Sequence, residues 1–141
     1  MKEEGESMSA HPTIEEVFKD LRVLVVDNDE PSLKLLQINL EKLGSSVTIA
    51  HDGPEAVAFA KENEYGACLM DILMPGMNGL DTIRHIRVEG KTKDMPIIVV
   101  TAVTTGNIRE QCRSVGADAY IMKPMQFEDV KEKIYYWICN K

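Results

Sequence analysis

Short apolar runs alternate with longer amphipathic stretches from residue 22 onward. Short runs that are apolar at successive positions are typical of strands buried on both faces of a parallel sheet. We expect strands over residues 22–26, 46–50, 67–71, 96–101 and 118–122. We expect helices over residues 31–43, 54–63, 79–88, 106–115 and 126–139. Pro31 suits a first helical turn and Gly44 suits the position just past a helix end, so both fit these bounds.

Five strand–helix units in succession predict the fold class. Parallel strands need crossover connections, which are right-handed and place helices on both faces of the sheet. We therefore expect an α/β fold with a five-stranded parallel sheet flanked by five helices. This domain is expected over residues 22–141, without a second domain, after an N-terminal extension over residues 1–21.

The extension contains a helix start signal. Thr13 suits an N-cap, and Glu16 three residues later completes a capping box. Apolar residues follow at helical spacing at Ile14, Val17, Phe18 and Leu21. We expect a short amphipathic helix here. Its apolar face could pack on this domain, on a partner or on a second copy of the chain.

Polar side chains stand at the ends of four predicted strands. These residues are Asp27, Asp71, Thr101 and Lys123. The carboxyl ends of parallel strands meet at one edge of an open α/β sheet, and this edge is where ligands bind. We therefore expect two carboxylates, a hydroxyl and an ammonium group to form a single site.

Asp71 is the candidate nucleophile of this site. A carboxylate can accept a phosphoryl group and form an acyl phosphate. Attack of one anion on another requires a divalent cation, and Mg²⁺ prefers oxygen ligands that include one or two carboxylates, here Asp27 and Asp71. Lys123 would supply a positive charge to one phosphoryl oxygen, and Thr101 would supply a hydroxyl donor to another.

Four segments closely resemble the receiver domain of two-component response regulators. They are Val25–Asp27, Met70–Gly79, Val100–Ala102 and Met122–Pro124, in the order in which the family has them. The resemblance extends over residues 22–139 and is greatest to the single-domain, chemotaxis-regulator type. It implies a flavodoxin-like doubly wound sheet with strand order 2-1-3-4-5.

The resemblance implies a regulatory phosphoacceptor of a two-component system or phosphorelay, and not an enzyme that acts on other molecules. Asp71 would take a phosphoryl group from a phosphohistidine of a sensor histidine kinase or a histidine phosphotransfer protein. Mg²⁺ would be bound by Asp27, Asp71 and the backbone carbonyl of Leu73. The domain would catalyse only its own phosphorylation and its own slow dephosphorylation.

The resemblance also implies a phosphoryl-binding group and a switch. Thr101, Ala102 and Lys123 would bind the phosphoryl group. Thr101 would move toward that group, and the ring of Tyr120 would swing inward behind it. Tyr120 lies three residues before Lys123, where the family has its switch aromatic, although an ordinary strand aromatic fits the same position. The Lys123–Pro124 bond is often cis in the family, and X-Pro bonds are where the cis form is accessible.

One position departs from the family pattern. Two adjacent acids usually follow the first strand, but here the pair is Asp27 and Asn28. Asn28 can offer a carbonyl oxygen to a metal, directly or through water, but it carries no charge. Because affinity in oxygen sites follows ligand charge, we expect weaker Mg²⁺ binding than in typical receivers. We do not expect a water-mediated contact from Asp29 to compensate.

Two apolar residues occupy positions that flank the phosphoryl group in the family. Leu73 lies two residues after Asp71, and Val103 lies two residues after Thr101. Neither side chain can orient a water molecule for attack on phosphorus or donate a hydrogen bond to it. We therefore expect slow self-dephosphorylation.

The predicted helix over residues 31–43 offers a candidate surface for the phosphodonor. Its inward stripe consists of Leu36, Leu40 and Leu43. Ile38 lies about 160° from this stripe at about 100° per residue, so it should face solvent. In the family this helix docks on the phosphodonor, and an outward Ile38, together with Leu33, suits that contact. An isolated exposed residue, or one covered by the helix near residues 13–21, is the alternative.

The last predicted helix offers a candidate output surface. Its buried face is expected to contain Phe127, Val130, Ile134 and Ile138, with Tyr136 roughly opposite. In the family the fourth helix, fifth strand and fifth helix carry output contacts or dimerisation. Tyr136 is therefore a candidate anchor for an unknown downstream protein or for a homodimer, and an exposed tyrosine without a partner is the alternative.

Composition argues against several classes of partner and location. The net charge of −7 argues against a nucleic-acid-binding surface, which needs clustered Lys and Arg. No apolar run approaches the roughly 18 residues of a membrane span, and no signal-peptide core is present. Three cysteines without zinc-site spacing favour reduced thiols and a cytoplasmic location.

Three alternative functions stay open at this point. The segment Asp27–Asp29 resembles the nucleophile motif of haloacid-dehalogenase-like phosphatases, although the usual Thr is missing and those enzymes are longer. A flavodoxin-like FMN carrier would need a phosphate-cradling loop after the first strand, where this chain has acidic residues. A pseudo-receiver that acts only through protein contacts is favoured by Asn28 but opposed by the intact Asp71.

Overall fold

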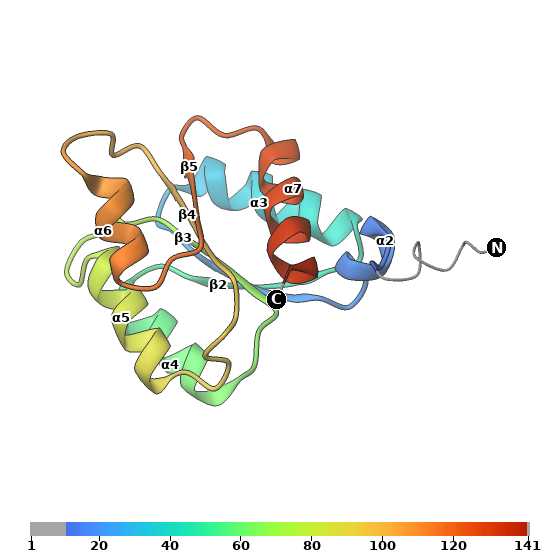
Figure 1. Cartoon of the computed structure of the whole chain (residues 1–141), viewed down its shortest axis with the longest axis horizontal. Helices are drawn as coiled ribbons and strands as arrows, with labels where there is room; N and C mark the ends of the chain where they lie inside the picture. Colours follow the sequence, from blue (N-terminus) through green and yellow to red (C-terminus); the bar gives the residue numbers. More distant parts are fainter. Residues whose placement is uncertain (1–10, 141) are drawn as a thin grey trace.

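The computed structural model describes residues 11–140, so the part of the N-terminal extension predicted over residues 1–10 lies outside the described range. The centre of the described chain is a five-stranded parallel sheet in the order β2-β1-β3-β4-β5 (Figure 1). The strands are β1 (Arg22–Val26), β2 (Ser46–Ala50), β3 (Ala67–Met70), β4 (Ile97–Thr101) and β5 (Ala119–Met122). The predicted fold class and strand order are confirmed.

Six helices accompany the sheet within the described residues. They are α2 (Ile14–Phe18), α3 (Glu30–Lys42), α4 (Gly53–Glu62), α5 (Gly79–Glu89), α6 (Ile108–Ser114) and α7 (Phe127–Cys139). α6 begins later than predicted, because Gly106 has a positive φ of 65° and Asn107 is also outside the helical region. None of these helices is both long and apolar enough to cross a membrane.

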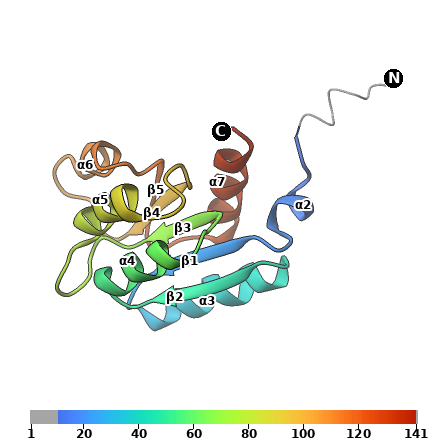
Figure 2. The same ribbon diagram turned by 90° about the horizontal axis from the view of Figure 1, so that it is seen from below.

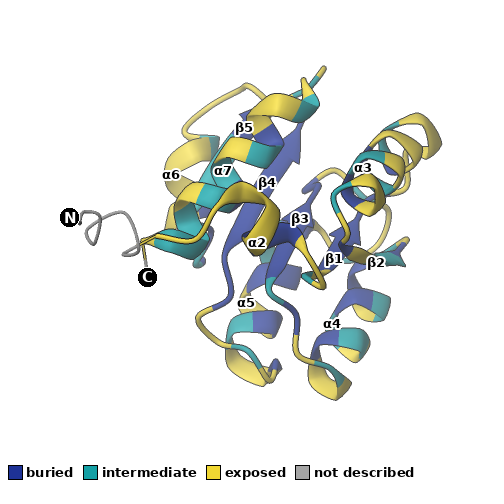
Figure 3. Ribbon diagram, turned by 90° about the vertical axis from the view of Figure 1, so that its right-hand side faces the viewer, coloured by how far each residue is buried: buried dark blue, intermediate teal, exposed yellow. Residues whose placement is uncertain are grey.

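The helices form a layer on each face of the sheet (Figure 2). α4, α5 and α6 cover one face of the sheet, where they pack against the side chains of Leu24 and Val26. α2, α3 and α7 pack on the other face, together with Val23 and Val25. Because both faces are covered, the central strands are buried along their length (Figure 3), which explains why their sequences are apolar without alternation.

The short helix α2 packs on its own domain, which decides among the three possibilities left by the sequence. Its predicted capping box is present: the Thr13 hydroxyl accepts from the Glu16 N–H at 3.1 Å, and the Glu16 carboxylate accepts from the Thr13 N–H at 2.8 Å. Val17 and Phe18 are buried, and the Ser45 hydroxyl donates to the Phe18 carbonyl at 2.7 Å. α2 therefore contributes core residues to the face that α3 and α7 also cover.

The prediction that Leu33 is part of an exposed surface is wrong. Leu33 is only 2% exposed and belongs to the core beneath α3. Leu33 lies three residues before Leu36 and seven before Leu40, so all three side chains share one face of the helix. Ile38 is 52% exposed, as predicted, and α2 does not cover it.

Arg87 of α5 ties together two loops at the amino ends of β4 and β5. Its guanidinium group donates to the carbonyls of Lys93 and Met95, both at 2.7 Å, and to the carbonyl of Gly116 at 2.6 Å. It also pairs with the Asp118 carboxylate at 3.0 Å. These contacts connect α5 to the segment before β4 and to the segment before β5.

The three cysteines are free, and they occupy the predicted elements: Cys68 in β3, Cys112 in α6 and Cys139 in α7. Complete burial raises the pKa of the Cys68 thiol to about 12. This thiol therefore stays protonated at neutral pH, and it packs as a small apolar side chain.

Candidate functional site

The carboxyl edge of the sheet brings together the four polar residues predicted from the strand ends. Asp27 and Asp71 follow β1 and β3, Thr101 ends β4, and Lys123 follows β5. β3 ends at Met70, one residue earlier than predicted, but the Asp71 N–H still donates to the Val26 carbonyl at 2.9 Å. This hydrogen bond extends the pairing of β1 with β3, so the two carboxylates leave the sheet as neighbours.

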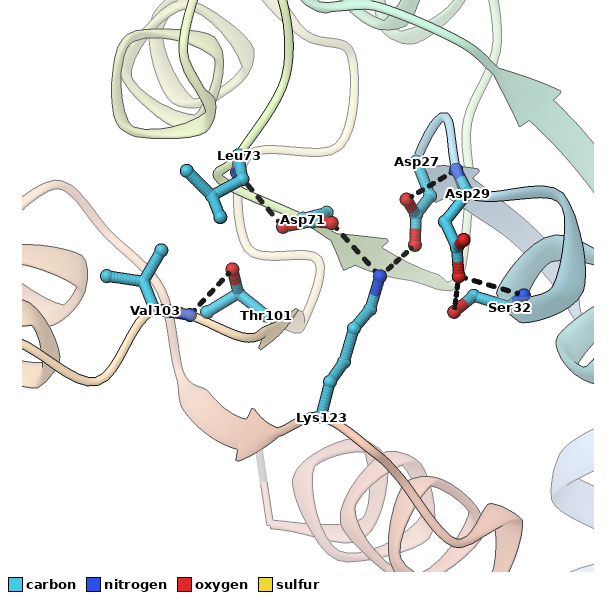
Figure 4. Close-up of polar contacts among 8 residues, drawn as sticks. All are labelled: Asp27, Asp29, Ser32, Asp71, Leu73, Thr101, Val103 and Lys123. Carbon is cyan, nitrogen blue, oxygen red and sulfur yellow. Dashed lines mark hydrogen bonds and ion pairs between the residues drawn. The ribbon is translucent and has the colours of Figure 1, made fainter.

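The Lys123 ammonium lies between the two carboxylates (Figure 4). Its Nζ is 2.8 Å from Oδ2 of Asp27 and 3.0 Å from Oδ2 of Asp71. The Lys123 N–H also donates to the Thr101 carbonyl at 2.8 Å, which fixes the start of the Lys123 side chain relative to β4. The Lys123–Pro124 bond is cis. Three strands thus contribute to one ion-paired group.

The charges of this group depend on one another. Burial raises the pKa of Asp27, although the Lys123 ammonium partly offsets this effect. Burial alone would lower the pKa of Lys123, but hydrogen bonds from its ammonium to Asp27 and Asp71 outweigh burial and raise it. Lys123 is therefore firmly charged at neutral pH, and it provides a fixed positive charge beside Asp71.

Each of the two carboxylates is also oriented by the loop that follows it. Oδ1 of Asp27 accepts from the Asp29 N–H at 3.0 Å, and Oδ1 of Asp71 accepts from the Leu73 N–H at 3.0 Å. Both acids are largely buried, while Leu73 at the mouth of the site is exposed. The donor set is therefore two oriented carboxylates beside the backbone of the loop that follows β3. Hard oxygen ligands of this kind fit Mg²⁺.

Asn28 and Asp29 add no third carboxylate to the site. Asn28 is exposed, and the Asp29 carboxylate accepts from both the N–H and the hydroxyl of Ser32. These hydrogen bonds lower the pKa of Asp29, which caps the amino end of α3. In the part of the chain that the structure describes, no three Asp, Glu, His or Cys side chains gather as a metal-binding group.

Thr101 and Val103 form the other side of the site. Thr101 is fully buried, and its hydroxyl accepts from the Val103 N–H at 3.5 Å. In Figure 4 these two residues lie on the Leu73 side of Asp71, away from Asp27. Ala102 between them is exposed.

Tyr120 is connected to this side of the site through Val103. Its hydroxyl donates a hydrogen bond to the Val103 carbonyl, and its ring packs against the core on the α4–α6 face. Burial raises the pKa of the Tyr120 hydroxyl, so the group is a protonated donor at neutral pH. The guanidinium carbon of Arg109 lies 4.8 Å from the centre of the Tyr120 ring. Nothing in the sequence pattern singled out Arg109.

The candidate partner residues lie away from the strand-end group. Ile38 is exposed on α3, and Tyr136 is 55% exposed on α7 with its ring 5.3 Å from that of Trp137. Tyr136 and Trp137 line a cavity of about 590 Å³ between α6, β5 and α7. Arg109 and Tyr120 line the same cavity. Tyr120, the predicted switch aromatic, and Tyr136, the predicted output residue, therefore line the same cavity.

Comparison with known families agrees with this geometry. The family model for the response regulator receiver domain matches residues 23–135. The chain therefore belongs to the receiver domain family of response regulators, which are regulatory signalling domains of two-component systems. The resemblance stated from the sequence motifs is confirmed.

Individual relatives place the chain within this family. The uncharacterized transcriptional regulatory protein YkoG of Bacillus subtilis strain 168 is 34% identical over 113 residues, which are 79% of this chain and 48% of that protein. The chain thus spans about half the length of this curated relative. The rest of that protein has no counterpart in the matched region of this chain.

Solved structures share the fold. The receiver domain of the sensor histidine kinase PA1611 from Pseudomonas aeruginosa, solved with a magnesium ion coordinated in its active site cleft, is 30% identical. Its TM-score is 0.77, and the match covers 84% of this chain and 98% of that chain. The chemotaxis protein CheY4 of Vibrio cholerae is 27% identical with a TM-score of 0.76, over 82% of this chain and 96% of that chain.

Proposed function

We propose that this chain is a phosphoacceptor switch, in which Asp71 takes a phosphoryl group from a phosphohistidine of a sensor histidine kinase or a histidine phosphotransfer protein. The observation that carries the proposal is the position of Asp71. Its carboxylate is oriented by the Leu73 N–H and paired with the Lys123 ammonium, and it neighbours the Asp27 carboxylate. A nucleophile, a metal ligand and a fixed positive charge therefore occupy one edge of the sheet.

The transfer exchanges one bond for another. An oxygen of the Asp71 carboxylate attacks phosphorus, and a P–O bond replaces the P–N bond of the donor. The electron pair of the broken bond stays on the donor's imidazole nitrogen. Lys123 offers positive charge to one phosphoryl oxygen, and Thr101 together with the backbone at Ala102 offers hydrogen-bond donors to others. The domain acts only on itself in this step.

Mg²⁺ is the cofactor that fits these residues. Asp27, Asp71 and the backbone carbonyl of Leu73 would hold it, and when bound it would neutralise charge between the anionic reactants. The magnesium ion in the PA1611 receiver domain supports this assignment. Asn28 adds at most a neutral oxygen, so we propose that this site binds Mg²⁺ more weakly than a site with three carboxylates.

The lifetime of the acyl phosphate follows from the two residues beside it. Leu73 is 57% exposed at the mouth of the site, and Val103 packs against the core. Neither side chain can align a water molecule with phosphorus. We therefore propose that self-dephosphorylation is slow. Thr101 and Tyr120 would pass the modified state to a partner surface.

Two surfaces are assigned to partners. Ile38 on α3 would contact the phosphodonor, and Tyr136 on α7 would contact a downstream protein or a second copy of the chain. Residues 22–141 would act as the receiver domain, preceded by the extension over residues 1–21, and the chain would work in the cytoplasm without nucleic acid or membrane as a ligand. These two surfaces would select the phosphodonor and the downstream protein.

Acetyl phosphate provides a direct test. The purified chain is incubated with acetyl phosphate and increasing Mg²⁺, and incorporation is followed by intact mass. We expect one phosphoryl group per chain, dependent on Mg²⁺, and none with Asp71→Asn. Incorporation that persists in Asp71→Asn or that ignores chelation of Mg²⁺ would contradict the proposal. Ile38→Asp is the matched surface control, and it should leave the reaction with acetyl phosphate unchanged.

A further inference from the structure

We propose that Arg109 is a positioning residue of the switch: its guanidinium group holds the ring of Tyr120 inward and so raises the response of the domain to modification of Asp71. This inference rests on the proposed function and names a regulatory element of the same site. The contact joins the first turn of α6 to β5, two elements that border the candidate output surface.

A continuous set of contacts leads from the site to Arg109. The Thr101 hydroxyl accepts from the Val103 N–H, the Val103 carbonyl accepts from the Tyr120 hydroxyl, and the Tyr120 ring lies beneath the Arg109 guanidinium. A threonine hydroxyl has one donor proton and two acceptor lone pairs. Thr101 can therefore donate to a phosphoryl oxygen while it still accepts from Val103. The phosphoryl group and Arg109 then favour the same position of the ring.

The distance and setting of Arg109 suit a cation–π contact. The guanidinium carbon is 4.8 Å from the ring centre, within the range of about 6 Å in which a cation is attracted to an aromatic face. Arg109 is exposed while the Tyr120 ring is partly buried, so the side chain covers the outer face of the ring. Movement of the ring outward would have to displace this cover.

Arg109 and Tyr120 also separate two cavities. Both residues line the cavity of about 590 Å³ between α6, β5 and α7. Both also line a second cavity of about 240 Å³ beneath the loop before α6. The position of the ring therefore sets the shape of both spaces at once. A change in the position of the Tyr120 ring would alter the surface that contains Tyr136.

The size of the effect follows from linkage. A cation–π contact at an exposed site changes an equilibrium by a factor of about 2 to 5. A ligand that favours the inward ring binds more weakly by at most the same factor when that contact is lost. Beryllofluoride with Mg²⁺ is the probe for the modified state of Asp71. We expect Arg109→Gln to raise its half-saturating concentration by up to about 5-fold.

The experiment has two readouts on the full chain. The four tyrosines are replaced with 3-fluorotyrosine, and Tyr120→Phe assigns the Tyr120 resonance in ¹⁹F spectra. Arg109→Gln should shift this resonance before any probe is added and should weaken the beryllofluoride response. Arg109→Lys keeps a cation and should restore most of both effects. Arg113→Gln removes the same charge from the same helix, and it should change neither readout.

The outcomes separate this inference from the proposed function. If wild type responds to beryllofluoride and Arg109→Gln matches it in both readouts, the role of Arg109 is overturned while the proposed function stands. If Arg109→Gln and Arg113→Gln weaken the beryllofluoride response equally, the effect is one of general charge, and the role of Arg109 is also overturned. If wild type shows no response that depends on Asp71, the proposed function fails and the role of Arg109 fails with it.

Discussion

The Asp29 carboxylate accepts two hydrogen bonds from Ser32, one from its N–H at 3.2 Å and one from its hydroxyl at 2.5 Å. Asp29 is the residue that could have replaced the second acid of a typical receiver, because it follows Asn28 directly. Its carboxylate instead caps α3, which leaves Asp27 and Asp71 as the two carboxylates of the proposed Mg²⁺ site. This relationship separates the role of position 28 from that of position 29, and each can be tested.

Asn28→Asp should strengthen Mg²⁺ binding. The added carboxylate restores one negative charge beside Asp27, and we expect affinity to rise by about tenfold, since affinity in oxygen sites follows ligand charge. Titration calorimetry of both proteins with Mg²⁺ measures the difference. Asn28→Gln is the matched neutral control. Equal affinities for wild type and Asn28→Asp would show that position 28 does not control the metal site.

Asp29→Ala should destabilise the fold by about 1 kcal/mol, because an N-cap is lost. Urea unfolding measures the change, and Asp29→Asn should keep most of the stability because Asn also caps. Ser32 lowers the pKa of Asp29 in the folded state. The charged form of the cap therefore adds stability at neutral pH, and this part is lost as the pH falls through the lowered folded-state pKa.

The pH dependence of the stability provides a control for the role of Asp29 as the N-cap. Asp29→Asn should lose less stability than wild type when the pH is lowered below about 4, since it has no carboxylate to protonate at this position. A wild type and an Asp29→Asn that lose stability in parallel would show that the Asp29 cap does not contribute to the pH dependence.

Polar side chains at positions 73 and 103 should shorten the life of the acyl phosphate. Leu73→Asn combined with Val103→Gln places groups beside phosphorus that can orient water, and we expect dephosphorylation to accelerate by about tenfold or more. The rate is followed by intact mass after the phosphodonor is removed. Rapid loss from wild type, unchanged by both substitutions, would mean that these positions do not control attack by water.

Arg87→Ala should lower the free energy of unfolding more than the loss of an exposed charged side chain does. Its loss leaves carbonyl groups of Lys93, Met95 and Gly116 without a charged donor, and we expect a loss of about 3 kcal/mol in urea unfolding. Arg84→Ala is the control, because its pair with Asp81 is exposed and is worth about 0.5 kcal/mol. Similar losses for both variants would show that the contacts of Arg87 add nothing beyond a surface pair.

The sequence was sufficient for those parts of the fold and site that depend on local pattern. Apolar runs predicted the central strands because these strands are buried on both faces, and the polar residues at the strand ends predicted a common edge. Leu33 was assigned to the wrong face because Leu36, Leu40 and Leu43 alone define the stripe too narrowly. The structure shows a wider stripe, in which Leu33 packs inward.

Contacts between distant segments could not be predicted in this way. Arg87 donates to carbonyl groups in two loops outside its own helix. Arg109 contacts the ring of Tyr120, eleven positions later on β5. Neither contact produces a repeated pattern in the sequence. Such contacts depend on how loops meet after the sheet has formed.

The position of the phosphoryl group on the chain tests the assignment of Asp71 most directly. The chain is treated with acetyl phosphate and Mg²⁺ and then with borohydride, which reduces an aspartyl phosphate to homoserine and marks the modified residue. Peptide mass spectrometry then identifies the position. We expect homoserine at residue 71 alone, and none when Mg²⁺ is chelated. Homoserine at residue 27, or at neither position despite incorporation, would contradict the assignment of Asp71 as the phosphoacceptor.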